Sequence, residues 1–247
     1  MTTATRLRFE QGARSDVGCV RRVNEDSWAA RLRDGLWLVA DGMGGHAHGQ
    51  WASSTIAAAL EAAPLPETFE EAAAAARAAL LAVNARIYAA TGADGAKIGS
   101  TVAMLLAREG RARVMWVGDS RVYRLREGAL DQLTTDHSQV EQLVARGLLT
   151  RAEAEQHPMA HVLARAVGVE PRLNVDMRDE MVLAGDVFLL CSDGLTRIVA
   201  DAEIAQTLAT EHPRRAADAL VALALARGAP DNVTVVVVGC DSTTLIG

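Results

Sequence analysis

The chain has 247 residues, of which 50% are hydrophobic and 23% charged, an ordinary globular composition that suits one large domain or two small ones. The net charge of -6 argues against a nucleic-acid partner, which would favour a basic face. The 3 cysteines, with no CxxC spacing, argue against a disulfide framework and structural zinc and fit a reducing cytoplasm.

No Pro/Gly/Ser-rich linker divides the chain, so we expect a single domain over residues 1–247. No apolar run has the form of a signal peptide or approaches the roughly 20 residues that a membrane helix needs. The sequence therefore predicts no membrane association and a cytoplasmic location, and we expect a monomer by default.

The first third of the chain is predicted to hold strands followed by two helices. Asp34-Gly35 separates two strand-like runs, which is a strong signal for a hairpin turn. The Ala-rich stretches that follow favour helices, separated at Pro64 and Pro66. In chain order we expect an edge strand over 7–13, strands over 26–33 and 36–40, and helices over 50–63 and 67–90.

Short apolar runs separated by glycine-containing turns then predict a meander of antiparallel strands. Residues 136–168 lack clear strand alternation, and we expect them to form a lobe over the sheet, with a helix over 138–147. Thr150 and Glu153 are spaced for a capping box at a second short helix. The predicted strands are 100–107, 113–117, 121–125, 129–133, 174–183, 186–191 and 233–239, and the predicted later helices are 201–209 and 213–226.

This order of elements predicts an α+β domain with antiparallel sheets in the middle and helix pairs outside. Several strands end or begin at an acid. Leu36 to Ala40 runs into Asp41-Gly42, and two further apolar runs end near Asp119 and Asp193. Asp231 and the pair Glu25-Asp26 instead precede strands. In an antiparallel sheet these ends and starts lie at one edge, so we expect the acids to converge there.

One acid alone is usually a turn or cap residue, but the repetition favours a shared site. Carboxylates in contact either share protons or bind cations. A site made only of oxygen ligands favours Mg²⁺ or Mn²⁺ over Zn²⁺. One Asp can bridge two ions and activate water for attack on phosphorus, and Asp41 is the best bridging candidate, because Gly42 also offers a close backbone carbonyl.

A basic residue close to the acids suggests how an anionic substrate would be attracted. Arg21 lies just before Glu25 and Asp26, and a guanidinium holds phosphate through two hydrogen bonds. A solvated surface charge is the usual role of a single arginine, and Arg22 is assigned that role. The sequence thus predicts Arg21 as a substrate-binding and catalytic residue.

The ordered set of motifs resembles the metal-dependent Ser/Thr protein phosphatases of type 2C, and covers nearly the whole chain. Each motif is weak alone, but the order is specific. The matching segments are Ser15-Asp16-Val17-Gly18, Arg21, Asn24-Glu25-Asp26, Val39-Ala40-Asp41-Gly42-Met43-Gly44-Gly45, Gly99-Ser100-Thr101, Gly118-Asp119-Ser120-Arg121, Leu133-Thr134-Thr135-Asp136-His137-Ser138, Ser192-Asp193-Gly194-Leu195 and Asp231-Asn232-Val233-Thr234.

The resemblance implies a central β-sandwich of two antiparallel sheets flanked by helix pairs, with residues 136–168 as a flap lobe that helps choose substrates. It implies hydrolysis of phosphoserine and phosphothreonine in proteins, opposing a Ser/Thr kinase, with two Mn²⁺ or Mg²⁺ ions and the third ion of bacterial members. Implied first-metal ligands, which are also catalytic, are Asp41, Asp193 and Asp231. Asp41 and the Gly42 carbonyl would hold the second ion, Glu25 and Asp26 its waters, and Asp119 with Asp193 a third ion.

The general acid has no clear match in this chain. His46 and His48 are near enough in sequence to be candidates, although a solvated loop histidine is the commoner role. Met43 stands at a position that varies in the family, and Gln50-Trp51 replaces an expected acid at the helix start.

Two other interpretations remain open from the residues. Cys191 and Arg197 have the Cys-five-Arg spacing of thiol phosphatases, but Asp193 inside that loop would repel thiolate and phosphate alike. Alternatively, the chain could be a catalytically inactive binding module that keeps the fold, although no ligand aspartate is missing.

Overall fold

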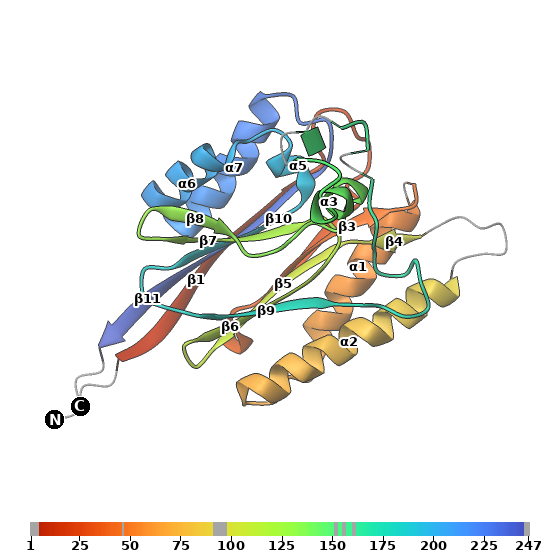
Figure 1. Ribbon diagram of the computed structural model, residues 1–247. Coiled ribbons are helices and arrows are strands. Elements are labelled where there is room, and N and C mark those ends of the chain that lie inside the picture. The colour runs from red at the N-terminus through yellow and green to blue at the C-terminus, as the bar shows by residue number, and fades with distance from the viewer. Residues whose placement is uncertain are drawn as a thin grey trace.

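Two antiparallel sheets pack face to face in the computed structural model, which describes residues 5–45, 47–90, 98–150, 153–154, 157–159 and 162–244 (Figure 1). The strands are β1 (Thr5–Asp16), β2 (Asp26–Arg31), β3 (Leu36–Met43), β4 (Gly99–Ser100), β5 (Val102–Arg108), β6 (Arg111–Val117), β7 (Arg121–Arg126), β8 (Ala129–Gln132), β9 (Asp176–Met181), β10 (Val187–Cys191) and β11 (Val233–Thr244). One sheet has the order β1-β11-β10-β7-β8, and the other β2-β3-β5-β6-β9 with β4 paired with β3.

Helices cover the outer face of each sheet. The helices of the described residues are α1 (Ala47–Ala62), α2 (Phe69–Ala90), α3 (Gln139–Ala145), α5 (Asp193–Thr196), α6 (Asp201–Thr210) and α7 (Pro213–Ala226). The pair α1 and α2 lies against the sheet of β3, and the pair α6 and α7 against the sheet of β11 (Figure 1). The predicted α+β sandwich with flanking helix pairs is confirmed.

Several strands are continuous apolar runs in the sequence because each sheet is covered by helices on one face and by the other sheet on the other. Side chains alternate between the two faces of a strand, and here both faces are covered. In β3, Leu36, Leu38 and Ala40 pack among the side chains of α1 and α2. Trp37 and Val39 point the other way, into the core between the sheets. A strand buried on both sides leaves no place for polar residues until it leaves the core, which β3 does at Asp41, two residues before its end.

The predicted hairpin around Asp34-Gly35 is confirmed, since β2 pairs antiparallel with β3, but its turn is wider than a two-residue Asp-Gly turn. The strand β2 ends at Arg31, and Leu32–Asp34 form a 3-10 turn closed by Gly35, whose φ is 64°. The Arg31 guanidinium bonds the Asp34 carboxylate at 2.8 Å and also the carbonyl oxygen of Ala63 at 2.6 Å. These contacts stabilise a wider turn that ties the hairpin to the end of α1.

Other predicted boundaries shift where distant segments supply backbone partners. The predicted strand over 100–107 is interrupted at Thr101, because its N–H donates to the Asp41 carbonyl and Ser100 pairs with Val167. The final strand continues to Thr244, since β1 pairs with it along its whole length. The helix α1 begins at Ala47, three residues before the predicted start.

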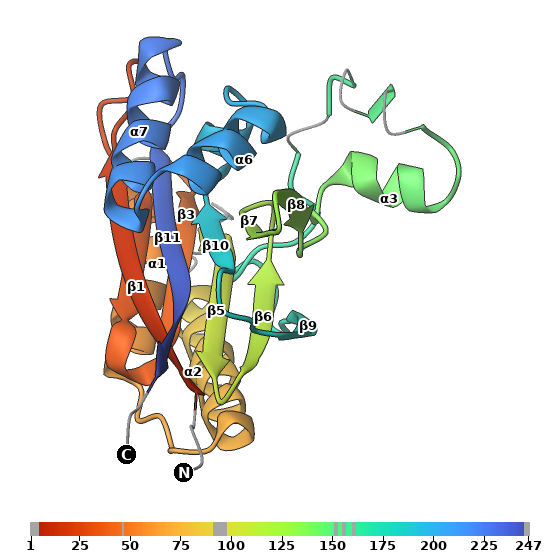
Figure 2. The same ribbon diagram turned by 90° about the vertical axis from the view of Figure 1, so that its left-hand side faces the viewer.

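In the described part of the predicted lobe over residues 136–168, α3 extends sideways, away from the sheets (Figure 2). Ser138 caps α3 by accepting from the Glu141 N–H at 3.2 Å. The predicted capping box is confirmed, since Thr150 and Glu153 bond each other's backbone N–H groups. Among the helices that the structure describes, none combines the length and apolar character of a membrane span.

Candidate metal centre

Acids from both sheets meet at one rim of the sandwich. Asp26 at the start of β2 and Asp41 near the end of β3 are direct cross-strand partners. In the other sheet, β10 ends two residues before Asp193, and β11 starts two residues after Asp231. The cavity at this rim has a volume of about 310 Å³. Its acidic lining residues are Glu25, Asp41, Asp119, Asp193 and Asp231.

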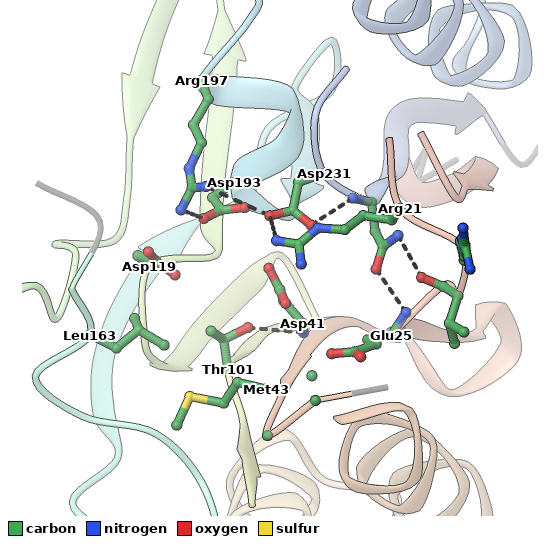
Figure 3. A pocket seen from close by; sticks show the side chains of 16 residues that line it. Arg21, Glu25, Asp41, Met43, Thr101, Asp119, Leu163, Asp193, Arg197 and Asp231 are labelled. Atoms are coloured by element: carbon green, nitrogen blue, oxygen red, sulfur yellow. Dashed lines mark hydrogen bonds and ion pairs between the residues drawn. The ribbon is translucent and has the colours of Figure 1, made fainter. Parts of the chain in front are cut away.

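The backbone of Asp41 is held on both sides by the segment between β4 and β5. The Thr101 hydroxyl accepts from the Asp41 N–H at 3.0 Å, and the Thr101 N–H donates to the Asp41 carbonyl at 2.8 Å. The Ser120 hydroxyl lies 2.6 Å from that of Thr101. The strand end is thus rigid, while the Asp41 carboxylate points into the cavity (Figure 3).

Close backbone contact places Gly42 and Glu25 side by side. The Gly42 N–H donates to the Glu25 carbonyl at 3.1 Å. A Cβ at Gly42 would overlap the Gly49 carbonyl group, and a Cβ at Gly49 would overlap the Glu25 carboxylate. Two glycines therefore allow β3, α1 and the segment before β2 to meet with almost no space between them.

Asp26 lies just behind the cavity and is 7% exposed. The Ser192 hydroxyl donates to its Oδ2 at 2.7 Å, which links the two sheets at the rim. Its Oδ1 is buried and accepts no hydrogen bond from the residues that the structure describes. A buried carboxylate oxygen without a donor is costly, and it fits a site that receives a cation or its bound water.

The clustering of acids changes their protonation. Burial raises the pKa of Asp26 to about 7, and it raises that of Asp119 to about 7 as well. Burial and the nearby carboxylates, Asp26 first among them, raise the pKa of Asp41 well above its ordinary value. The site therefore carries more negative charge than it stabilises by itself, which is the electrostatic requirement for divalent cations.

Two arginines already neutralise part of this charge. The Arg21 Nη2 lies 2.9 Å from Asp231 Oδ2, and Arg197 forms an ion pair with Asp193 (Figure 3). No three His, Cys, Asp or Glu side chains in the described ranges are gathered closely enough to hold an ion. The donors at the rim are nevertheless all oxygen atoms, and together with the buried Asp26 oxygen they fit Mg²⁺ or Mn²⁺. The two arginines pair with carboxylates that a bound metal ion would otherwise draw closer together.

The raised pKa values predict an unusual pH dependence of stability for the metal-free protein. The folded state binds protons at Asp26 and Asp119 up to about pH 7, whereas their ordinary pKa is 3.8. The free energy of unfolding should therefore fall as the pH rises between about 4 and 7. In EDTA, we expect the Tm to drop by about 5 °C or more from pH 5 to pH 8.

The control is Asp119→Asn, which removes one of these protonation sites and should flatten the slope. Adding Mn²⁺ should raise the Tm more at pH 8 than at pH 5, because the ion competes with protons for the same oxygens. Thermal unfolding followed by circular dichroism measures the Tm of the metal-free protein, of Asp119→Asn and of the protein with Mn²⁺. A metal-free Tm that rises steadily to pH 8 would contradict the raised pKa values.

The other sequence candidates are placed as follows. Met43 lines the cavity, and so does Leu163, which comes from the predicted lobe. His48 is exposed on α1 and does not line the cavity, whereas His46 lies outside the described residues. Cys191 is fully buried, and burial raises the pKa of its thiol to about 12. A thiol of this kind is a poor nucleophile, which argues against the thiol-phosphatase interpretation.

Four residues at the site were not predicted to have a role there. Thr101 and Ser192 orient Asp41 and Asp26 through their hydroxyl groups. The Asn232 side chain accepts from the Glu25 N–H at 2.8 Å and donates to the Val17 and Val23 carbonyls. Arg197 was considered only in the thiol loop, because the sequence gives no signal for the short helical turn on which its spacing of four from Asp193 forms an ion pair.

The comparisons with known proteins agree with this geometry. A family model described as protein phosphatase 2C matches residues 20–227. The serine/threonine protein phosphatase PstP of Mycobacterium tuberculosis is 41% identical over 236 residues, which are 94% of this chain and 45% of PstP. The chain therefore spans about half the length of that relative.

Two solved structures are also similar over nearly the whole chain. The first is described as PppA, a key regulatory component of T6SS in Pseudomonas aeruginosa; it is 41% identical, with a TM-score of 0.89 over 96% of this chain and 100% of that one. The second is the catalytic domain of PstP in complex with 2 manganese ions. It is 37% identical, with a TM-score of 0.82 over 96% of this chain and 100% of that one.

Proposed function

Because the chain belongs to the protein phosphatase 2C family, we propose that it is a metal-dependent protein serine/threonine phosphatase. Its reaction would be the hydrolysis of phosphoserine and phosphothreonine in proteins. The observation that supports this most is the rim of the sandwich, where five carboxylates and Arg21 line one cavity. The relative solved with manganese has the same fold over 96% of this chain, which supports Mn²⁺ or Mg²⁺ as the cofactor.

The ligand set implied by the family resemblance is supported by the position of these acids at or beside one cavity. We assign Asp41, Asp193 and Asp231 to the first ion, and Asp41 with the Gly42 carbonyl to the second, with Glu25 and Asp26 holding its waters. The sequence motifs alone would also imply a third ion at Asp119 and Asp193. Bound ions of this kind lower the pKa of water and neutralise charge that develops on a phosphoryl group.

The protein's own groups position the site for that chemistry. Thr101 and Ser192 fix the Asp41 backbone and the Asp26 carboxylate, so neither acid must reorganise when a ligand arrives. The side chain of Arg21 is 57% exposed at the mouth of the cavity, where an incoming phosphate first meets the protein. Its planar guanidinium suits two phosphate oxygens at once.

Replacing Arg21 should therefore weaken substrate binding. For Arg21→Ala we expect the KM for a phosphopeptide to rise about tenfold or more, which is the usual size of a lost charge-assisted contact. Arg21→Lys keeps the charge but not the planar fork, so its KM should lie between the two. Arg22→Ala is the matched control, because Arg22 also lines the cavity but is assigned no role. An unchanged KM in Arg21→Ala would contradict the assignment.

The proposal extends to the class of substrate, the oligomeric state and the location of the protein. Phosphorylated proteins of a cognate Ser/Thr kinase pathway are the expected partners, and residues 1–247 would act as one catalytic domain and as a monomer. Leu163 lies at the cavity, which supports a role of the 136–168 lobe in substrate choice. The three free cysteines fit a reducing cytoplasm.

The test of the function is hydrolysis of p-nitrophenyl phosphate and of phosphothreonine and phosphotyrosine peptides. We expect turnover with Mn²⁺ that EDTA abolishes, that Asp193→Ala loses, and that prefers phosphothreonine. Loss of activity on thiol alkylation of folded protein would instead favour the thiol mechanism at Cys191. No turnover from folded, manganese-loaded protein would favour the inactive binding module.

A further inference from the structure

Arg197 lies directly beside the acids of the cavity. It follows the short helix α5, four residues after Asp193, and its N–H donates to the Asp193 carbonyl at 2.9 Å. That spacing puts both side chains on one face of the helical turn. The guanidinium approaches Asp193 from the side that faces Asp119 (Figure 3).

The Arg197 guanidinium lies among carboxylates, as a bound metal cation would. It forms an ion pair with Asp193 Oδ2, and its Nη1 lies 3.7 Å from Asp231 Oδ2. Its positive charge also opposes the rise that burial causes in the pKa of Asp119. A second cavity, of about 690 Å³, lies next to the cavity at the rim. Both cavities are lined by Asp119, Asp193 and Arg197, so these three side chains form the boundary between them.

We propose that the Arg197 guanidinium takes the place of a third divalent cation between Asp119 and Asp193, so that the protein holds two metal ions rather than three. An arginine side chain stays charged at every accessible pH, and it cannot dissociate from a site on its own chain. A divalent ion between the same two carboxylates would have to displace it or accept its repulsion. The inference deepens the proposed function and rests on its metal centre.

A different role for Arg197 would be to bind the substrate phosphate. Arg21 is better placed for that, because its side chain is 57% exposed at the mouth, whereas the side chain of Arg197 is 26% exposed. The two roles differ in what a substitution changes. A phosphate ligand affects KM and phosphate affinity, whereas a substitute cation affects how many Mn²⁺ ions bind.

The experiment counts Mn²⁺ ions bound to the full chain, by electron paramagnetic resonance of free Mn²⁺ and by calorimetry, without substrate. We expect two ions in the wild type. Arg197→Ala should bind a third ion at least about tenfold more tightly than the wild type does, and Arg197→Lys should stay at two because it keeps a cation. Arg22→Ala, which removes a charge from the same cavity, should also stay at two.

A second variant separates the proposed site from any general effect of charge. In the background of Arg197→Ala, Asp119→Ala should remove the third ion again, whereas Asp119→Ala alone should leave two. Three ions in the wild type, or two in Arg197→Ala with weakened phosphate binding, would overturn the inference and leave the phosphatase function intact. No Mn²⁺ binding in the wild type would overturn the proposed function along with it.

Discussion

Asp41→Asn should lower kcat/KM for p-nitrophenyl phosphate by about 10³ or more at saturating Mn²⁺. The substitution keeps the size of the side chain and leaves the backbone bonds to Thr101 in place. It removes the one negative charge that is proposed to contact both ions. Since Asp41 lies between the acids of both sheets, its loss should weaken the binding of the two ions together, and calorimetry should show a fall in Mn²⁺ affinity.

The matched control is Asp16→Asn. Asp16 also ends a strand at the same rim, because it pairs with Val233 at the start of β11. Its Oδ1 accepts from the Gly18 N–H at 3.0 Å, and it does not line the cavity. We expect activity within about threefold of the wild type, with any loss appearing in stability instead. Equal losses in both variants would mean that charge at the rim, rather than metal contact, accounts for the effect of Asp41.

The rim could be predicted from the sequence because the same physical constraint acts on every strand. A strand buried on both faces is apolar until it leaves the core, so the first acid marks the edge of the sheet. In an antiparallel arrangement, Asp41 near the end of one strand and Asp231 before another then reach the same edge. Neither conclusion needs a knowledge of side-chain packing. Both sheets are antiparallel, as the sequence pattern predicts.

Features that depend on contacts between distant segments could not be predicted in this way. The break at Thr101 depends on a carbonyl of β3 and on the lobe at Val167. The 3-10 turn after Arg31 depends on carbonyls at the end of α1. Local sequence propensity predicts neither feature. The possible hydrogen-bond partners of these segments are equivalent until the tertiary structure brings one of them into place.

The role of Arg197 was hidden for a related reason. The residues from Asp193 to Thr196 form a single helical turn, too short for any periodic signal. Without that helix, the spacing of four between Asp193 and Arg197 has no structural meaning, and the Cys191 spacing is the more visible pattern. Only the position of the turn directly after β10 brings the guanidinium to the acids.

Gly42→Ala should damage both the fold and the metal centre. The new Cβ would overlap the carbonyl group of Gly49 and press on the Glu25 carbonyl, and none of these backbone atoms can rotate away. The end of β3 must then move from α1, which strains the bond from the Gly42 N–H to Glu25. We expect a loss of about 2–3 kcal/mol in the free energy of unfolding and a Tm lower by about 6–10 °C.

Activity should fall further than stability alone explains, because Gly42 and Glu25 are both proposed to serve the second ion. Gly128→Ala is the control: the turn between β7 and β8 has a φ of 81° at Gly128, but open space around a Cβ. It should cost about 1 kcal/mol and leave the Mn²⁺ dependence of the rate unchanged. If Gly42→Ala kept the wild-type Mn²⁺ dependence, the close packing of β3 on α1 would serve the fold and not the metal centre.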